Sequence, residues 1–209
     1  MWGRKVKMSK IKQFINKKIV QPTIIRNRRN EFDLPPMTVI SSDCSGGVLC
    51  HDYGLPLDSP TINLIIEDSD FISFCQNLPK YLQYQLIDGG LDKNNGYPIA
   101  YCGDIKIKGV HYHTFDDLSV TWNRRKARVH YDNIVYIMTQ RQIITPGSFD
   151  SFMKLDGKKL FLSSENFAAE HDTAVGLNNF DRMFLFDGYS GHRYIDKEFN
   201  FAKWYYNHY

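Results

Sequence analysis

The segment Ser42–Gly47, with the sequence SDCSGG, could carry chemistry because it directly follows a β-branched run. Ligands of open α/β sheets bind beyond the carboxyl ends of the strands, and this segment leaves a predicted strand at that end. Gly46 and Gly47 permit positive φ angles and a close approach to the backbone. The amides from Ser45 onward, with Ser42 beside them, could therefore bind a phosphate or an oxyanion. A plain tight turn would explain the same residues without a ligand.

Cys44 in the same segment could act as a nucleophile if a base lies within hydrogen-bond reach. The candidate bases in the sequence are His51, His111 and His113. The alternative is that Cys44 is a small buried hydrophobic residue with no role in chemistry.

The block from Gly103 to Asn133 contains the densest group of candidate functional residues. Asp104 and His111 lie at a predicted strand and its exit, and either could accept a proton from a substrate hydroxyl. Alternation along VHYH would place His111 and His113 on the same strand face. That arrangement is compatible with a metal pair, but no third ligand follows at a diagnostic spacing.

A predicted helix in this block carries Arg125 and Arg128 close to Trp122. Arginine clusters suit diphosphates because a guanidinium group binds two oxygens in one plane. An aromatic residue such as Trp122 or Tyr112 could stack on a nucleotide base or a sugar. The alternative is a solvated basic face whose arginines pair with nearby carboxylates.

A short Asp-x-Asp pattern, from Asp68 to Asp70, follows a hydrophobic run. Carboxylates of this kind suit Mg²⁺ or Mn²⁺, and the ion would neutralise the departing diphosphate of a sugar nucleotide. The same residues also fit the ordinary start of a helix.

Residues 1–29 contain many lysines and arginines and no Asp or Glu, whereas the rest of the chain is net acidic. Five apolar residues of the segment 5–20 fall near one face of a helix: Val6, Ile11, Phe14, Ile15 and Ile19. Lysines occupy most of the remaining positions, so the helix could lie on an anionic membrane surface. The alternatives are a solvated helix packed on the domain and a flexible arm.

The composition indicates a folded protein of ordinary size. Hydrophobic residues make up 43% of the 209 residues and aromatic residues 14%, which is too apolar for a disordered chain. The net charge of +3 does not indicate a dedicated nucleic-acid binder. The four cysteines lack C-x-x-C spacing, and neither a secretory signal nor a membrane-length apolar run is visible. We therefore expect a cytoplasmic protein, held peripherally at the inner face of the cell membrane if the basic arm binds lipid.

Strands alternate with helices along the chain, which favours a layered α/β/α domain with a mainly parallel or mixed sheet. We expect a basic arm over 1–29, a proline-containing linker over 30–36 and a single α/β domain over 37–209. The expected strands are residues 37–41, 61–67, two short strands around Gly103, 134–139, 158–164 and 181–187. The expected helices are residues 69–83 with an interruption at Pro79, 114–129 with Thr114 as its cap, and 196–208. Residues 90–98 are expected to form a loop.

These motifs, taken in order from Thr38 to Lys159, resemble a bacterial family called domain of unknown function nineteen-nineteen. The resemblance rests on the segments ISSDCSGG, SPT, DF, VHYHTF and WNRRKAR. Residue by residue it covers Ser42, Cys44, Gly46, Gly47, Ser59, Pro60, Thr61, Asp70, Phe71, Asp104, His111, Tyr112, Phe115, Trp122, Arg125, Arg128, Asp132 and Asn133. This chain departs from the family pattern at Asp43, where an amide is expected, and at Gln140–Arg141, where Asp-Arg is expected. Only Asp70 of the Asp-x-Asp pair belongs to the pattern, and it is the candidate metal ligand.

Members of that family are often labelled exopolysaccharide or capsule biosynthesis proteins, so the resemblance implies an α/β fold and a role in surface-polysaccharide assembly. We expect a glycosyltransferase with a sugar-nucleotide donor, a Mn or Mg ion as cofactor and a glycan or lipid-linked glycan as acceptor. His111 or Asp104 would be the base, and Arg125 with Arg128 would bind the diphosphate. Two alternatives stay open: an acyl- or phosphoryl-transferase that uses Cys44 or His111, and a non-catalytic glycan-binding or scaffold protein.

Overall fold

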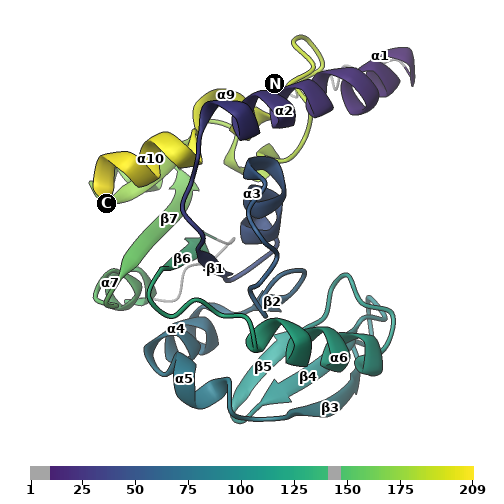
Figure 1. Ribbon diagram of the computed structural model, residues 1–209, viewed down its shortest axis with the longest axis vertical. Coiled ribbons are helices and arrows are strands. Elements are labelled where there is room, and N and C mark those ends of the chain that lie inside the picture. The colour runs from purple at the N-terminus through teal and green to yellow at the C-terminus, as the bar shows by residue number, and fades with distance from the viewer. Residues whose placement is uncertain (1–9, 141–146) are drawn as a thin grey trace. The chain divides into compact units, whose positions relative to one another are not determined.

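The computed structural model describes residues 10–140 and 147–209, and the chain divides into two compact units (Figure 1). The terminal unit consists of Met1–Leu34, Asp52–Gly54 and Ser163–Tyr209, and the central unit of Pro35–His51 and Leu55–Leu162. Val6 and Arg141, which entered the predictions above, lie outside the described residues.

A parallel sheet forms the first layer of the central unit. Its strands are β1 (Thr38–Ser41), β6 (Ile134–Thr139) and β7 (Lys158–Ser164), with Thr38 opposite Ile134 and Val135 opposite Lys158. The strands are buried along almost their whole length, which explains why they read as continuous apolar runs. The last two residues of β7 belong to the terminal unit, where β8 (Ala174–Leu177) completes the strand order β1-β6-β7-β8.

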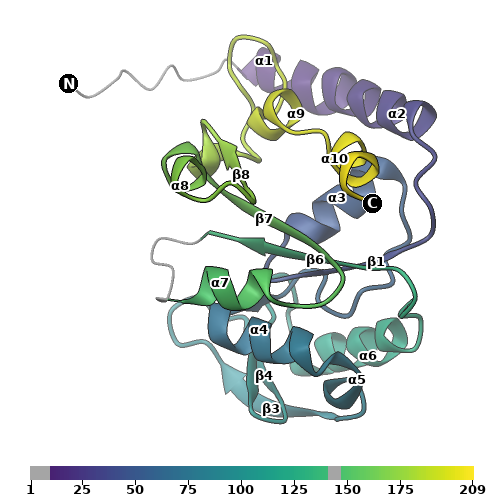
Figure 2. The ribbon, with the colours of Figure 1, turned by 90° about the vertical axis from the view of Figure 1, so that its left-hand side faces the viewer.

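Two helices leave this sheet on opposite sides. Helix α3 (Ser45–Tyr53) follows β1, and α7 (Ser148–Met153) precedes β7. Figure 2 shows α3 and α7 on opposite sides of β1 and β6. The crevice at the carboxyl ends of two neighbouring parallel strands, where the connections go to opposite faces, is the usual ligand position in open α/β sheets. A ligand site is therefore expected at the β1–β6 boundary.

A second, antiparallel sheet follows β1 in the chain and has the strand order β2-β5-β4-β3. Its strands are β2 (Ile65–Ile66), β3 (Leu86–Leu91), β4 (Pro98–Cys102) and β5 (Ile105–Lys108). The amide of Ile66 donates to the carbonyl of Ser42 at 3.0 Å, which joins this sheet to the end of β1.

Three helices complete the central unit: α4 (Asp68–Gln76), α5 (Leu78–Tyr81) and α6 (Phe115–Lys126). Phe74 of α4 lies at their centre, with its ring centroid 5.7 Å from that of Tyr81 and 6.0 Å from that of Trp122. The side chain of Thr114 accepts a hydrogen bond from the amide of Asp117 at 3.1 Å and caps α6, as the sequence predicts. The expected interruption at Pro79 is also confirmed, because a new helix begins at Leu78.

The mixed α/β class is confirmed, but four local predictions are wrong. The expected strand over 61–67 is reduced to β2, because a turn closed by the Leu64 amide and the Thr61 carbonyl occupies its first half. The expected loop over 90–98 begins with the end of β3, and the strand expected over 181–187 is a short 3₁₀ helix, η2 (Phe180–Arg182), followed by turns. The single helix expected over 196–208 is divided into α9 (Tyr194–Glu198) and α10 (Phe201–His208), since the Asn200 side chain caps the second helix.

The terminal unit begins with one continuous helical run. It comprises α1 (Lys10–Ile15), a π-helical turn η1 (Asn16–Val20) and α2 (Gln21–Glu31), so the helix extends beyond the expected residue 20. The same unit contains α8 (Glu165–Glu170), α9 and α10. Over the described ranges, no helix combines the length and apolar character that crossing a membrane requires.

Four buried charges connect the parts of the terminal unit. Nη1 of Arg28, on α2, lies 3.0 Å from Asp52 Oδ2 and 2.9 Å from Asp196 Oδ1. Arg193 pairs with the same two carboxylates, with its Nη2 2.9 Å from Asp196 Oδ1. Burial alone would lower the pKa of Arg193, but the bonds to Asp196 and Asp52 outweigh it and raise that pKa. Two arginines thus share two aspartates, and every charge of this four-residue network has a counter-charge.

Replacing one carboxylate of the network should destabilise the protein strongly. Asp52→Asn would leave two buried guanidinium groups with a single counter-charge, and breaking a buried pair in this way costs about 3–5 kcal/mol. The free energy of unfolding, from urea titration followed by circular dichroism, measures the loss. Lys197→Ala is the matched control, because it removes a partly exposed ion pair with Asp187 whose contribution is about 0–1 kcal/mol. Equal effects of the two variants would contradict the importance of the network.

Candidate functional site

The turn between β1 and α3 is held by the side chain of Ser41 at the end of the strand. Its Oγ accepts a hydrogen bond from the amide of Gly46 at 3.2 Å and donates one to the carbonyl of Asp43. Ser42 is fully buried and also bonded: its amide donates to Ile137, and its Oγ accepts from the amide of Thr139 at 3.3 Å. Ser42 therefore anchors the turn to β6 and has no group directed toward solvent.

Gly46 and Gly47 serve close packing and not the unusual backbone angles that the sequence suggested. Neither is among the described glycines with positive φ, and both lie within α3. A Cβ atom on Gly46 would lie 2.7 Å from Ser41 Oγ, and one on Gly47 would lie 3.0 Å from Cγ2 of Ile62. The glycine pair lets the first turn of α3 approach the end of β1.

Asp43 occupies the position at the start of α3 where a phosphate would be expected. Its Oδ1 accepts from the amide of Ser45 at 2.9 Å, and its Oδ2 accepts from the Thr139 hydroxyl. A carboxylate at a helix N-terminus is favourable in itself, and it repels a second anion. The amides of Ser45 and Gly46 are thus bonded within the chain, so the expected phosphate cradle is largely filled by the protein's own groups.

The Ser-Pro-Thr motif lies against this turn through a chain of hydroxyl groups. The Thr61 Oγ1 accepts from the amide of Ser41 at 2.9 Å and lies 3.0 Å from the Ser59 Oγ. Both hydroxyl residues are buried. The following turn places Asn63 at φ 67°, and Asn63 is the only non-glycine residue with positive φ among those described. Two motifs that are separate in the sequence therefore form one structure.

Arg125 is the charged residue of this region that points to a ligand. It is only 7% exposed, and its Nη1 donates to the carbonyl of Ile62 at 3.1 Å and to the hydroxyl of Tyr112 at 3.0 Å. The Tyr112 hydroxyl in turn donates to the same carbonyl at 3.4 Å. Burial raises the pKa of Tyr112, so its hydroxyl stays protonated at neutral pH. The Nε–H of Arg125 is buried and finds no hydrogen-bond partner among the described residues.

The other buried arginines all have carboxylate partners. Arg28 and Arg193 share two aspartates, whereas no carboxylate pairs with Arg125 anywhere in the described parts of the chain. Arg128, which the sequence places with Arg125, is instead turned toward Asp58, with its Nε 3.1 Å from Oδ1. His130 lies 3.7 Å from the second oxygen of Asp58. A buried guanidinium group without a counter-charge is costly, and an anionic ligand would supply the missing charge.

Trp122 does not fit the stacking role that the sequence suggested. Its side chain is 1% exposed and packs against Phe74 inside the central unit. A ring so completely buried cannot stack on a nucleotide or a sugar, so Trp122 belongs to the core. Tyr112 is half-buried beside Arg125 and remains available for contact with a ligand.

The two candidate bases lie at opposite ends of one strand. Asp104 precedes β5, is exposed and accepts a hydrogen bond from the Tyr81 hydroxyl at 2.9 Å. His111 follows β5, is exposed and adjoins Tyr112. A four-residue strand spans about 13 Å, so one substrate hydroxyl cannot reach both groups. Since β5 ends at Lys108, His111 and His113 lie in a turn, and the predicted shared strand face is absent.

The Asp-x-Asp pair begins α4 and supports the antiparallel sheet. Oδ2 of Asp70 accepts a hydrogen bond from the amide of Lys106 at 2.9 Å, and Asp68 is buried in the first turn of the helix. No group of three or more His, Cys, Asp or Glu side chains in the described ranges is arranged to hold a metal ion. The observed role of Asp70 is to hold β5 against α4.

Of the four cysteines, only Cys44 is partly exposed. Burial, with a smaller effect from Asp58, raises the pKa of Cys50 to about 12, and burial raises that of Cys102 to about 12. Burial also raises the pKa of Cys75 well above its ordinary value. Cys44 directly precedes α3, and His51 lies seven residues further along the chain, about 10 Å along the helix axis, so it is too distant to activate the thiol.

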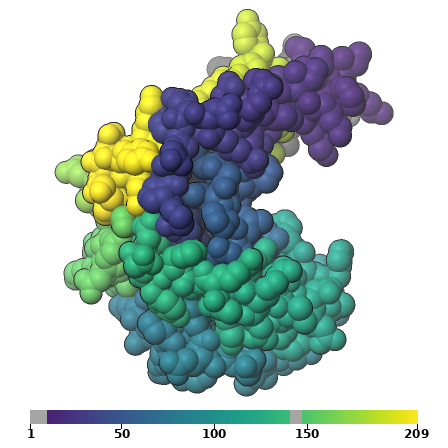
Figure 3. All heavy atoms as spheres, in the orientation of Figure 1, coloured from purple at the N-terminus to yellow at the C-terminus, as the bar shows by residue number. Residues whose placement is uncertain are grey.

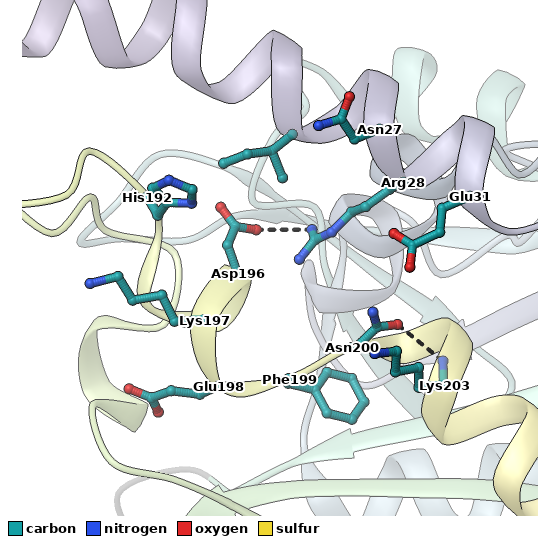
Figure 4. A pocket seen from close by; sticks show the side chains of 11 residues that line it. Asn27, Arg28, Glu31, His192, Asp196, Lys197, Glu198, Phe199, Asn200 and Lys203 are labelled. Carbon is teal, nitrogen blue, oxygen red and sulfur yellow. Dashed lines mark hydrogen bonds and ion pairs between the residues drawn. The ribbon is translucent and has the colours of Figure 1, made fainter.

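The terminal unit contains a separate pocket of about 440 Å³ between α2 and the α9–α10 region (Figure 4). Figure 4 shows Arg28 paired with Asp196 at one side and Asn200 bonded to the amide of Lys203 at another. Glu198 also faces this pocket and accepts from the amide of Asn178 at 2.8 Å. Much of the charged lining is therefore engaged in holding the unit together.

Sequence reasoning missed three residues that shape the site at the β1–β6 boundary: Asp43, Thr61 and Asn63. Asp43 stood out only as a departure from the family pattern, and Thr61 only as part of a short motif. Asp43 bonds Thr139 and Thr61 bonds the amide of Ser41, and both partners are distant in the chain, so spacing alone carried no signal. Asn63 offered one weak signal, because asparagine tolerates positive φ better than most residues.

The fold and these residues define an α/β protein with a strand–turn–helix site and a buried arginine that pairs with no carboxylate of residues 10–140 or 147–209. Residues 15–206 match the family model described as a domain of unknown function (DUF1919), and the chain belongs to that family. A protein of Haemophilus influenzae described as "Uncharacterized protein" is 30% identical over 208 residues. The match covers 95% of this chain and 97% of that protein. The family resemblance is thus confirmed over most of the chain.

We expect one cysteine to react quickly with a thiol reagent in the folded protein. Cys44 is partly exposed and open to a reagent, whereas Cys50 and Cys102, each with a pKa of about 12, stay protonated and buried. Titration with a chromogenic disulfide should therefore show one fast thiol in buffer and all four in denaturant. Cys44→Ser should abolish the fast phase, and a fast phase that survives in this variant would contradict the assignment.

Gly46→Ala should destabilise the protein, since the new methyl group would collide with Ser41. Such overpacking typically costs about 1–3 kcal/mol, measured as the change in the free energy of unfolding. Gly47→Ala is the control: its methyl group meets only Ile62, whose Cγ2 atom at 3.0 Å must shift slightly, and the gain in helix propensity of about 1 kcal/mol offsets the crowding. A Gly46→Ala variant as stable as the parent would show that the turn has room.

Proposed function

We propose that this protein is a transferase that binds an anionic donor through Arg125, namely a glycosyltransferase with a sugar-nucleotide donor. The observation that carries the proposal is the buried guanidinium group without a carboxylate partner in the described parts of the chain. A diphosphate suits it because the guanidinium fork bonds two oxygens at once, and the charge of a departing diphosphate would be stabilised there. The family resemblance supplies the setting, which is the assembly of surface polysaccharide.

The acceptor would be a hydroxyl group of a glycan or a lipid-linked glycan. His111 is the better placed of the two candidate bases, since it adjoins Tyr112, whose hydroxyl is bonded to Arg125. As a neutral imidazole it would accept the acceptor proton while the new glycosidic bond forms and the nucleoside diphosphate leaves. Asp104 lies at the far end of β5 and is assigned a structural bond to Tyr81 instead.

A Mg²⁺ or Mn²⁺ ion commonly accompanies sugar nucleotides and would neutralise part of the diphosphate charge. The described residues offer no group of three side chains that could hold such an ion. Asp70, the candidate ligand, already accepts a hydrogen bond from the backbone amide of Lys106 through its Oδ2. We therefore assign stabilisation of the diphosphate charge to Arg125.

Arg125→Lys should weaken donor binding at least about tenfold, because a lysine keeps the charge but loses the two-pronged geometry. Isothermal titration with UDP-, GDP- and CDP-sugars, with and without Mn²⁺, measures the affinity. Arg128→Lys is the control, since Arg128 already pairs with Asp58, and we expect a change of no more than about twofold.

A second variant covers the case in which Arg125→Lys fails to fold. Tyr112→Phe removes one hydroxyl that orients Arg125 and keeps the ring, so it should also weaken donor binding while the circular dichroism spectrum stays unchanged. Binding of a sugar nucleotide that is indifferent to both variants would overturn the role of Arg125. Binding of an oligosaccharide without any nucleotide would overturn the transferase in favour of a glycan-binding protein.

A second reaction class is favoured by one observation, the accessibility of Cys44 at the carboxyl end of β1. An acyl- or phosphoryl-transferase could use this thiol as a nucleophile, with the group passing to sulfur and then to a glycan hydroxyl. Loss of activity on alkylation of Cys44, with protection by the donor, would support this class over the glycosyltransferase. Full activity of Cys44→Ser would remove it.

A further inference from the structure

The N-terminal helix carries an apolar stripe that the rest of its unit leaves uncovered. Ile11, Phe14, Ile15 and Ile19 are 73%, 62%, 41% and 58% exposed. Their spacing of three, one and four residues places them on one side of the run formed by α1 and η1. Figure 3 shows the atoms of this run at the molecular surface. Large apolar side chains grouped in this way on one exposed face mark an interaction surface.

The run formed by α1 and η1 meets the rest of the terminal unit at Asn16, which is not part of the stripe. Asn16 is the buried residue of η1, and a Cβ atom on Gly191 would collide with its side-chain oxygen. Every residue of α1 is exposed, so the stripe lies outside this contact. Packing of the helix on the unit, one alternative left open by the sequence, therefore does not cover these four residues.

Lysines border the stripe. Lys10, Lys12, Lys17 and Lys18 are all exposed, and no Asp or Glu occurs before Glu31. An anionic lipid surface complements both features, since its headgroup layer offers negative charge and the boundary below it accepts apolar side chains. A second copy of the chain would bring the same positive charges to the contact, which disfavours self-association.

We propose that the stripe of Ile11, Phe14, Ile15 and Ile19, with its bordering lysines, docks this protein on an anionic membrane surface. The helix would lie in the plane of the interface, with the stripe at the headgroup–acyl boundary and the lysines among the phosphates. Membrane docking is independent of the donor assignment above, because the stripe belongs to the terminal unit, whereas Arg125 and Tyr112 belong to the central unit.

Sedimentation with vesicles tests the docking directly, using the full chain and no nucleotide. We expect the protein to pellet with vesicles of phosphatidylcholine and phosphatidylglycerol, and to bind pure phosphatidylcholine at least about tenfold more weakly. The double variant Phe14→Ser with Ile15→Ser should lose binding by at least about tenfold, because it removes the centre of the stripe. The variant Lys17→Glu with Lys18→Glu should lose binding to the anionic vesicles in the same way.

Val120→Ser is the matched control, because Val120 is an equally exposed apolar residue, at 68%, on helix α6 of the central unit. It should bind vesicles as the parent does. The thermal midpoint of each variant should be unchanged, since the altered side chains are exposed. Absence of pelleting with anionic vesicles would overturn the proposal, as would binding that the stripe variants do not weaken. A dimer that Phe14→Ser dissociates, without vesicle binding, would assign the stripe to a second copy instead.

Discussion

The burial of positive charge is the constraint on which the terminal unit depends most. Arg28 and Arg193 lie inside it, and neither could remain there without Asp52 and Asp196. Each aspartate serves both arginines, so the four side chains act as one network and not as two separable pairs. The network joins α2, the last turn of α3 and the start of α9, three elements that are distant in the chain. A hydrophobic contact at the same place would not specify which elements meet.

Arg125 in the central unit is also a buried positive charge, but no described carboxylate pairs with it. Arg125 is as buried as Arg28, but its described hydrogen-bond partners are a backbone carbonyl and a tyrosine hydroxyl, both of them uncharged. Folding does not place a charge in such surroundings without a compensating interaction. The contrast between the two environments is the reason for assigning structure to one set of arginines and ligand binding to the other. Arg128, which is paired with Asp58 and more exposed, belongs to the first set.

The turn after β1 has the sequence of a ligand-binding motif, but most of its groups contact other parts of the protein. Its glycines admit the side chains of Ser41 and Ile62, and its amides are bonded to Asp43 and Ser41. The side chains of Asp43 and Cys44 are partly exposed, so a ligand could reach the carboxylate and the thiol. The turn therefore presents a negative charge and a sulfur atom at the edge of the sheet, and it is poorly suited to bind a phosphate. The chemistry of the site depends on residues contributed by other segments.

The sequence by itself determined the features that depend on neighbours in the chain. Continuous apolar runs predicted β6 and β7, Thr114 and Asp117 predicted the start of α6, and alternating lysines and apolar residues predicted the N-terminal helix. Only the tertiary structure decided which candidate residues meet. Trp122 is buried in the core, and β5 separates Asp104 from His111. Arg128 pairs with Asp58, whereas no described carboxylate pairs with Arg125. The physical reason is that burial and ion pairing join residues far apart in the chain, whereas caps and periodicity act within a few residues.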